Sequence, residues 1–164
     1  MIASTFVRPI GVVHTSADDE VVRAAAPDLP STIEVFEPFA DALEGIDGFS
    51  RLIVLTLLDR IDEEARSTLQ VKPRGLLRLG LGLDELPTIG VFACDSPVRP
   101  NPIAVSIVRL RERVGRSLHV EGLDVFDGTP VLDLKPYGPD RVVPEVTVPA
   151  WHEELIRRSG SRRV

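Results

Sequence analysis

Short apolar segments separated by turn residues run through most of the chain, and they restrict its fold more than any other feature. Each segment is four to eight residues long, and many are rich in valine and isoleucine, which is typical of β-strands. The segments are Phe6–Val13, Ile33–Phe36, Leu52–Leu58, Ile89–Ala93, Ile103–Leu110, Leu118–Gly122 and Val131–Lys135. Seven short strands with few crossover helices predict a mainly β protein, a small single-domain antiparallel β-barrel.

Helix signals are confined to two stretches of the chain. Acidic residues in the first turn favour a short helix over Asp62–Leu69, and Pro149–Arg158 begins with proline and ends in arginines, an order that favours a helix. No repeat or long linker divides the chain. We therefore expect a barrel domain over residues 5–140 and a C-terminal extension over residues 141–164, with a short helix and a basic tail.

Composition narrows the class of protein and its compartment. The chain has 164 residues, of which 43% are hydrophobic and 5% aromatic, so its core should be aliphatic. A single cysteine, Cys94, excludes an intrachain disulfide and a multi-cysteine zinc cluster. The longest nearly uncharged run, Leu52–Leu58, is too short to cross a membrane. We expect no secretory signal, because residues 1–6 show no basic start followed by an apolar segment. We expect a cytoplasmic protein without a membrane partner.

The net charge of −6 argues against broad, nonspecific nucleic-acid binding. Arginine nevertheless outnumbers lysine 17 to 2, which suits bidentate recognition of phosphate or carboxylate but could equally reflect the codon composition of the source genome. The local basic groups are Lys72, Arg74 and Arg78 in the loop 72–87, Arg109, Arg111 and Arg113 at alternate strand positions, and the tail arginines 157, 158, 162 and 163. Alternate spacing places the middle three on one face of a strand.

Common catalytic motifs are missing from the sequence. There is no G-x-G-x-x-G, P-loop, H-E-x-x-H or G-x-S-x-G pattern. The three histidines, His14, His119 and His152, lie far apart in the sequence, so we expect no metal site. Cys94 ends an apolar segment and has no neighbouring basic residue, which favours an inert thiol over a nucleophile.

Two segments stand out. Gly90–Ile103 contains prolines at 97, 100 and 102, which form a stiff loop that would hold Arg99 and Asn101 ready for a polar ligand or, alternatively, serve as a structural corner. In Gly122–Tyr137, Asp127-Gly128-Thr129-Pro130 predicts a turn between two extended runs. The charged residues Asp124, Asp133 and Lys135 of these runs either face solvent or line the barrel mouth.

Together these segments carry a family signature. The pattern G-V-F-A-x-x-S-P-x-R-P-N-P-I, followed by L-D-x-x-D-G-T-P-V-L-D-x-K-P-Y, resembles the TsaA-like (TrmO-type) methyltransferases. Pro9–Val13, Ile33–Glu37 and Leu43–Ser50 fit upstream, so the resemblance covers residues 7 to 137 in order. It implies a small β-barrel that binds S-adenosylmethionine without a Rossmann fold and acts as a homodimer.

The resemblance also implies an enzyme, an S-adenosylmethionine-dependent methyltransferase that modifies tRNA. Members of this type methylate N6-threonylcarbamoyladenosine at position 37 of tRNA, beside the anticodon. Two alternatives stay open: a methyltransferase of a small metabolite, and a non-catalytic S-adenosylmethionine-binding module. Labelled cofactor and total tRNA would separate the three.

Carried over by position, the resemblance implies three groups of cofactor contacts. They are Asp59 and Arg60; Phe92, Ala93, Cys94 and Asp95 with the following loop as far as Val105; and Leu123, Asp124, Val125 and Phe126. Candidates for a catalytic role in the two motifs, with no individual role assigned, are Arg99, Asn101, Asp127, Asp133, Lys135 and Tyr137.

Three short motifs of the chain depart from the bacterial family pattern, at five residues in all. Asp59-Arg60 replaces His-Gln, Cys94-Asp95 replaces Thr-Arg in A-T-R-S, and Arg51 replaces the histidine of F-S-H. A sign exchange between Arg60 and Asp95 could preserve a charge pair, if the two side chains meet, or could mark a changed substrate.

Overall fold

The computed structural model describes residues 6–24, 28–74, 77 and 80–159. It divides into two compact units. The first unit comprises residues up to Arg60 together with residues 102–141, and the second comprises residues 61–101 and those from Val142 onward. Residues 61–101 thus belong to the second unit although they lie within the range expected for the barrel domain.

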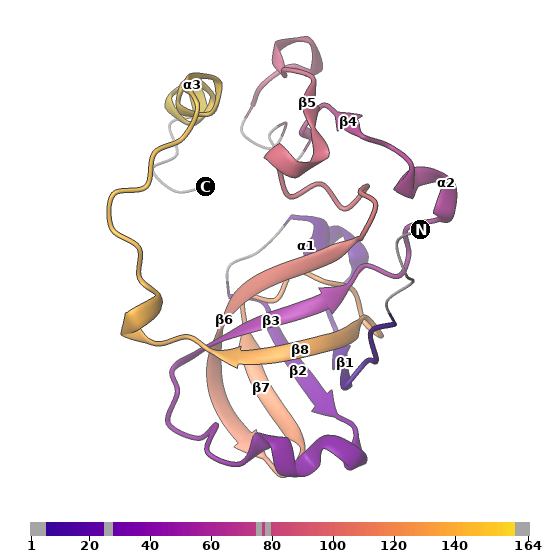
Figure 1. Ribbon diagram of the computed structural model, residues 1–164, viewed down its shortest axis with the longest axis vertical. Helices are drawn as coiled ribbons and strands as arrows, with labels where there is room; N and C mark the ends of the chain where they lie inside the picture. The colour runs from indigo at the N-terminus through magenta and orange to yellow at the C-terminus, as the bar shows by residue number, and fades with distance from the viewer. Residues whose placement is uncertain (1–5, 25–27, 75–76, 78–79, 160–164) are drawn as a thin grey trace. The chain divides into compact units, whose positions relative to one another are not determined.

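The first unit is a closed barrel of six antiparallel strands (Figure 1). Its strands are β1 (Gly11–His14), β2 (Pro30–Val35), β3 (Arg51–Leu57), β6 (Ile103–Val114), β7 (Ser117–Glu121) and β8 (Pro130–Pro136). The order around the barrel is β1-β2-β7-β6-β3-β8, and β8 closes the sheet onto β1. The barrel predicted from the sequence is confirmed.

Side chains that alternate between core and surface fill the barrel interior, most regularly in β1, β2, β3 and β7. In β3, Leu52, Val54 and Thr56 are fully buried, whereas the residues between them are partly exposed. The same period of two in the other strands builds one aliphatic core, because successive side chains of a strand point to opposite faces. Gly11 lets β1 and β2 approach closely, since a Cβ there would overlap the carbonyl oxygen of Glu34.

A β-bulge in β6 changes the face of one predicted cation. The pairing with β7 shifts register between Leu110 and Glu112, so Arg113 lies opposite the buried Leu118. The extra residue reverses the alternation that the sequence implied. The prediction that Arg113 shares a face with Arg109 and Arg111 is therefore wrong. Arg113 Nη1 instead donates to the Leu43 carbonyl and pairs with Asp47 at 3.1 Å.

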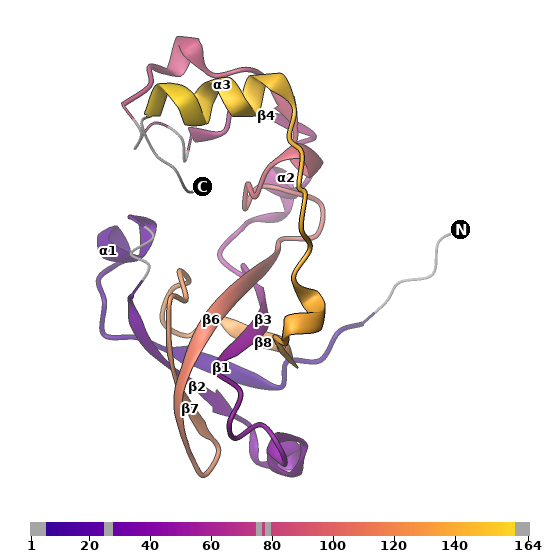
Figure 2. The same cartoon turned by 90° about the vertical axis from the view of Figure 1, so that its left-hand side faces the viewer.

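Short helices lie at opposite ends of the barrel (Figures 1 and 2). The α-helix α1 (Asp19–Arg23) follows β1 and buries Val22. The 3₁₀ helix η1 (Glu37–Leu43) follows β2 and buries Leu43 against the core. The first unit ends with a second 3₁₀ turn, η5 (Pro139–Arg141).

The second unit consists of short elements. They are α2 (Glu63–Arg66), β4 (Gln70–Val71), η3 (Leu83–Glu85), β5 (Ile89–Gly90), η4 (Val91–Ala93) and α3 (Ala150–Ser159). Asp62 begins α2 by accepting a hydrogen bond from the Ala65 amide at 2.7 Å. Both predicted helices are present, although α2 is shorter than expected. The predicted strand Ile89–Ala93 is correct for only two residues, because Val91–Ala93 forms a 3₁₀ turn.

Candidate functional site

Arg60, which follows β3, lies over an aromatic ring at one end of the barrel. Its guanidinium carbon lies 4.4 Å from the ring centroid of Phe126, a cation–π distance. Nη1 pairs with the Asp19 carboxylate of α1 at 3.0 Å, and Nη2 donates to the Asp127 carbonyl oxygen at 3.3 Å. Arg60 thus joins α1 to the 123–127 segment, two regions far apart in the sequence.

Arg23 of α1 is a second arginine in the same cluster. The guanidinium of Arg23 lies 5.2 Å from the centroid of Phe126 and 3.8 Å from the Asp19 carboxylate. Two cations and one carboxylate therefore surround a half-buried ring. The motif analysis missed Asp19 and Arg23, because a five-residue helix carries no periodic pattern. The only sequence signal for this helix is the order of its charges, with acidic residues in the first turn and an arginine in the last.

Asp127 stands on a tight turn beside this cluster. Its Oδ1 accepts a hydrogen bond from the Thr15 amide at 3.0 Å and lies 3.8 Å from His14 Nδ1. The following residue, Gly128, has a φ of 81°, which favours glycine. The turn predicted from Asp127-Gly128-Thr129-Pro130 is present, with the Thr129 amide bonded to the Phe126 carbonyl. The Asp127 carboxylate is 61% exposed and so remains accessible to a ligand.

The 123–126 segment alternates between core and surface. Leu123 and Val125 are buried in the core, whereas Asp124 is exposed and Phe126 half-buried. The Ser106 hydroxyl donates to Asp124 Oδ1 at 3.3 Å. Leu123 and Val125 therefore anchor the segment. Asp124 presents an exposed carboxylate, and Phe126 presents its aromatic ring to Arg60.

The other predicted cofactor residues of the first unit are also exposed. Asp59 follows β3, where its amide bonds to the Leu57 carbonyl at 2.9 Å. Val105 lies on the outer face of β6, opposite Leu55, and is 66% exposed.

Phe92, Ala93, Cys94 and Asp95 belong to the second unit, as do Arg99 and Asn101. The Arg99 guanidinium reaches back to its own loop, where Nη2 donates to the carbonyl oxygens of Val91 and Cys94 at 2.5 and 2.9 Å. Arg99 Nε is buried without a hydrogen-bond partner among the described residues. Asn101 and Phe92 are exposed, the latter at 83%. Arg99 is thus held as expected, but by carbonyl groups rather than by an acid.

The remaining candidates, Asp133, Lys135 and Tyr137, lie on β8 or directly after it, away from the Arg60 cluster. Asp133 and Lys135 form an ion pair of 2.6 Å, and the Tyr137 amide bonds to the Arg51 carbonyl at the start of β3. At about 3.3 Å per residue, β8 separates Asp127 from Tyr137 by about 20 Å. The structure therefore brings Asp127 to Arg60 and Phe126 but does not bring Lys135 or Tyr137 there.

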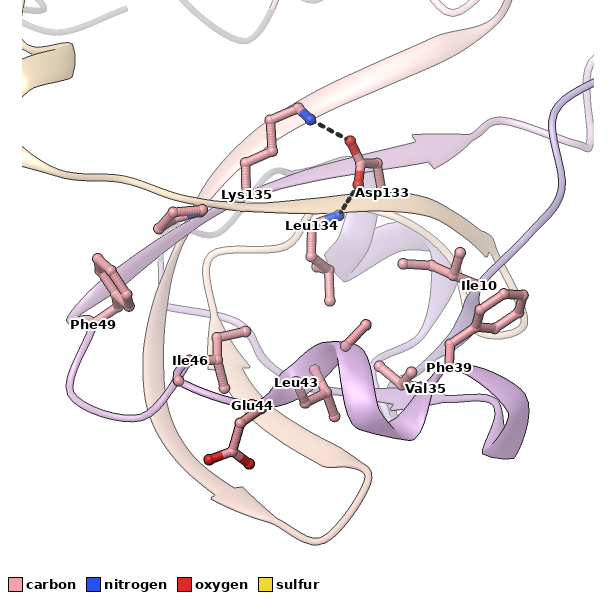
Figure 3. A pocket seen from close by; sticks show the side chains of 13 residues that line it. Ile10, Val35, Phe39, Leu43, Glu44, Ile46, Phe49, Asp133, Leu134 and Lys135 are labelled. Carbon is pink, nitrogen blue, oxygen red and sulfur yellow. Dashed lines mark hydrogen bonds and ion pairs between the residues drawn. The ribbon is translucent and has the colours of Figure 1, made fainter.

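A pocket of about 310 Å³ lies beside η1. Apolar side chains from η1, the following loop and β8 line it, among them Phe39, Leu43, Ile46 and Leu134. Figure 3 shows Leu134 pointing into the pocket, whereas Asp133 and Lys135 project from the other side of β8. The two charged candidates therefore belong to the outer face of the barrel.

One ion pair on β6 and β7 changes the titration of its members. Arg111 Nη2 lies 2.6 Å from Glu121 Oε2. The hydrogen bond between them lowers the pKa of Glu121 and raises that of Arg111.

Among the described residues, no helix is long and apolar enough to span a bilayer.

Comparisons with known proteins agree on one family. Residues 21–141 match the family model of the tRNA-methyltransferase O N-terminal domain. A probable S-adenosyl-L-methionine-binding protein of Pyrococcus abyssi is 37% identical over 160 residues, which cover 95% of this chain and 80% of that protein. An S-adenosyl-L-methionine-binding protein of Archaeoglobus fulgidus is 35% identical, over 81% of this chain and 89% of its own length.

A solved structure shows the same fold. The crystal structure of TrmO from Pseudomonas aeruginosa superposes with a TM-score of 0.64 at 30% identity and covers 88% of this chain. This chain spans 62% of the TrmO chain. With a family model that matches most of its length, the chain belongs to the family of tRNA-methyltransferase O N-terminal domains.

Proposed function

We propose that the protein binds S-adenosylmethionine and transfers its methyl group to N6-threonylcarbamoyladenosine at position 37 of tRNA, as a cytoplasmic homodimer. The observation that carries this proposal is the convergence of Arg60, Phe126 and Asp127 at one barrel end. Membership of the TrmO family and the names of the archaeal relatives support the cofactor.

The side chains at this end fit the chemical groups of the cofactor. Arg60 can hold the carboxylate of its methionine part, as it holds that of Asp19. The Asp124 carboxylate, oriented by Ser106, can accept hydrogen bonds from the ribose hydroxyls. Phe126 offers an aromatic face next to these groups, and aromatic faces attract cations such as a sulfonium.

The chain then has two chemical tasks, which are to hold the reacting groups in position and to accept the N6 proton. When bound, S-adenosylmethionine supplies an electrophilic methyl group on a sulfonium. The acceptor N6 of an acylated adenine is a weak nucleophile, because its lone pair is delocalised into the ring and the carbonyl. Asp127, whose Oδ1 is fixed by the Thr15 amide, is the base that accepts the N6 proton in this proposal. The buried side chains of Leu123 and Val125 fix the segment that leads to it.

One observation favours a small metabolite as the alternative substrate. The barrel arginines Arg23, Arg60, Arg113 and Arg116 all pair with carboxylates, which reduces the positive field available to tRNA. Incubation with labelled S-adenosylmethionine and total tRNA separates the two substrates. Label in tRNA supports the proposal, whereas cofactor binding without labelled tRNA favours the metabolite.

The homodimer is tested separately. A dimer interface near the cofactor end would complete the walls of an otherwise open site. Light scattering at working concentration should report twice the mass of the chain, and a monomer would contradict this part of the proposal.

A further inference from the structure

Two arginines face each other across neighbouring strands on the outside of the barrel. Arg51 of β3 is the direct partner of Arg109 of β6, and both side chains are exposed. The Leu110 amide donates to the Ser50 carbonyl one position away, so the arginine pair occupies the close, non-hydrogen-bonded position of an antiparallel ladder. Cβ atoms in such a pair are about 4.5–5.5 Å apart, and like charges there destabilise the sheet.

Local acids offset this repulsion only in part. Among the described residues, neither Arg51 nor Arg109 forms an ion pair, although the field of Arg109 reaches Glu121 and helps to lower its pKa. Glu121 itself is engaged by Arg111 at 2.6 Å. Glu121 is also the direct partner of Arg109 on β7 and offsets part of the repulsion. Arg51 forms no ion pair among the described residues, so a ligand that carries negative charge would relieve the rest.

The neighbouring positions extend the cationic surface. Lys135 of β8 is the partner of Ile53, the next outward-facing residue of β3 after Arg51. Arg111 lies at the bulge of β6, between Leu110 and Glu112, and its guanidinium reaches Glu121, the partner of Arg109. We call Arg51, Arg109, Arg111 and Lys135 the β3–β6 cationic face; two of its members, Arg111 and Lys135, are paired with acids. Arginine forks in such a row suit the oxygens of successive phosphates.

Distance from the candidate active site limits the size of this ligand. Arg51 begins β3 and Arg60 follows its other end, and the strand alone spans about 20 Å. A single nucleoside or amino acid bound at Arg60 cannot reach Arg51. A folded RNA can, because its charged backbone extends over many nucleotides.

We propose that the β3–β6 cationic face binds the phosphodiester backbone of the RNA substrate, remote from the nucleotide that is methylated. This inference rests on the proposed function and deepens it by naming a surface that holds the substrate. RNA is the occupant that fits this face, because facing arginines call for anionic oxygens and a phosphodiester backbone supplies them at every nucleotide. A second copy of the chain is the alternative outcome of the test below.

The test compares the salt dependence of tRNA binding in the full chain and its variants. Arg51→Ala/Arg109→Ala should weaken binding of unfractionated tRNA about tenfold or more and reduce the slope of log K against log salt by about 1.5 to 2. Arg51→Lys/Arg109→Lys should keep the slope, because it keeps both charges. Arg66→Ala serves as the control, since it removes a cation that already pairs with Glu63 on α2 and lies outside the predicted basic groups.

Parallel measurements of tRNA binding, methyl transfer and mass distinguish a failure of this inference from a failure of the proposed function. If the wild type methylates tRNA but the Arg51→Ala/Arg109→Ala variant matches Arg66→Ala in affinity and slope, the inference is wrong and the proposed function stands. If the wild type binds tRNA through these arginines without methyl transfer, the surface stands and the function fails. If the Arg51→Ala/Arg109→Ala variant differs from the wild type in mass by light scattering but binds tRNA equally well, the face belongs to a contact with a second copy, and the inference is overturned.

Discussion

The guanidinium of Arg60 lies 4.4 Å from the ring centroid of Phe126 while its Nη1 pairs with Asp19 at 3.0 Å. This contact joins a residue that follows β3, a helix near the N-terminus and the Leu123–Phe126 segment at one end of the barrel. The cation–π contact and the ion pair are both partly exposed, and such contacts contribute about 1 kcal/mol or less each to stability. Their consequence is the fixed placement of a positive charge beside an aromatic ring.

Replacing Arg60 should therefore impair cofactor binding more than folding. We expect Arg60→Ala to weaken S-adenosylmethionine binding about tenfold or more, through loss of a charge-assisted contact worth about 1.5–3 kcal/mol. Calorimetric titration measures the affinity, and the melting temperature should change little. Arg23→Ala, which leaves Arg60 on the ring, should have a smaller effect; equal losses for both variants would contradict the assignment of the carboxylate to Arg60.

Asp127→Asn separates catalysis from binding. The asparagine oxygen can still accept the Thr15 amide hydrogen bond, so the turn should remain folded. Loss of the proton acceptor should lower kcat about 10²-fold or more with an unchanged cofactor affinity. Single-turnover kinetics with tRNA check this. A variant with normal kcat would remove Asp127 from the role of base.

Arg99→Ala should lower the free energy of unfolding. Its guanidinium satisfies the carbonyl groups of Val91 and Cys94, and leaving them unpaired costs about 1–3 kcal/mol. The urea midpoint should fall, and amides of the Val91–Asp95 segment should exchange faster with solvent. Arg74→Ala, at an exposed position of the same unit, provides the control. An unchanged midpoint together with lost methyl transfer would instead make Arg99 a ligand-binding residue.

Glu121→Gln should change how the free energy of unfolding depends on pH in the acid range. Arg111 lowers the pKa of Glu121 in the folded protein, so the unfolded state binds more protons in the acid range. The contribution of the pair is present above the ordinary glutamate pKa of about 4.3 and disappears as the pH falls below it. Urea unfolding between about pH 3 and pH 7 should show a shallower rise for the variant than for the wild type. Parallel profiles would show that the pair contributes nothing.

Short apolar segments, many of them rich in valine and isoleucine and separated by turn residues, predicted the strands of the barrel. In β3 the side chains also alternate between core and surface. Leu52, Val54 and Thr56 show this pattern, and the predicted strand Leu52–Leu58 differs from β3 by one residue at each end. The bulge between Leu110 and Glu112 could not be predicted, since an extra residue in one strand is defined by its partner strand. The misplacement of Arg113 followed from it.

The sequence pointed to some residues of the Arg60 cluster and missed others. The positions around Arg60 and Leu123–Phe126 came from a motif resemblance, and the structure brings Arg60, Asp124, Phe126 and Asp127 to one end of the barrel. Their partners on α1 were missed, because that helix is held by ion pairs and one buried valine rather than by a periodic pattern. The separation of Asp127 from Lys135 and Tyr137 became visible only with the direction of β8.

The most direct test of the account is nucleoside analysis of tRNA after incubation with the purified protein and S-adenosylmethionine. The account predicts that N6-threonylcarbamoyladenosine gains one methyl group with the wild type, and that Asp127→Asn, which keeps the fold and binds the cofactor, adds about 10²-fold less. Cofactor binding by the wild type without any methylated nucleoside in tRNA would contradict it.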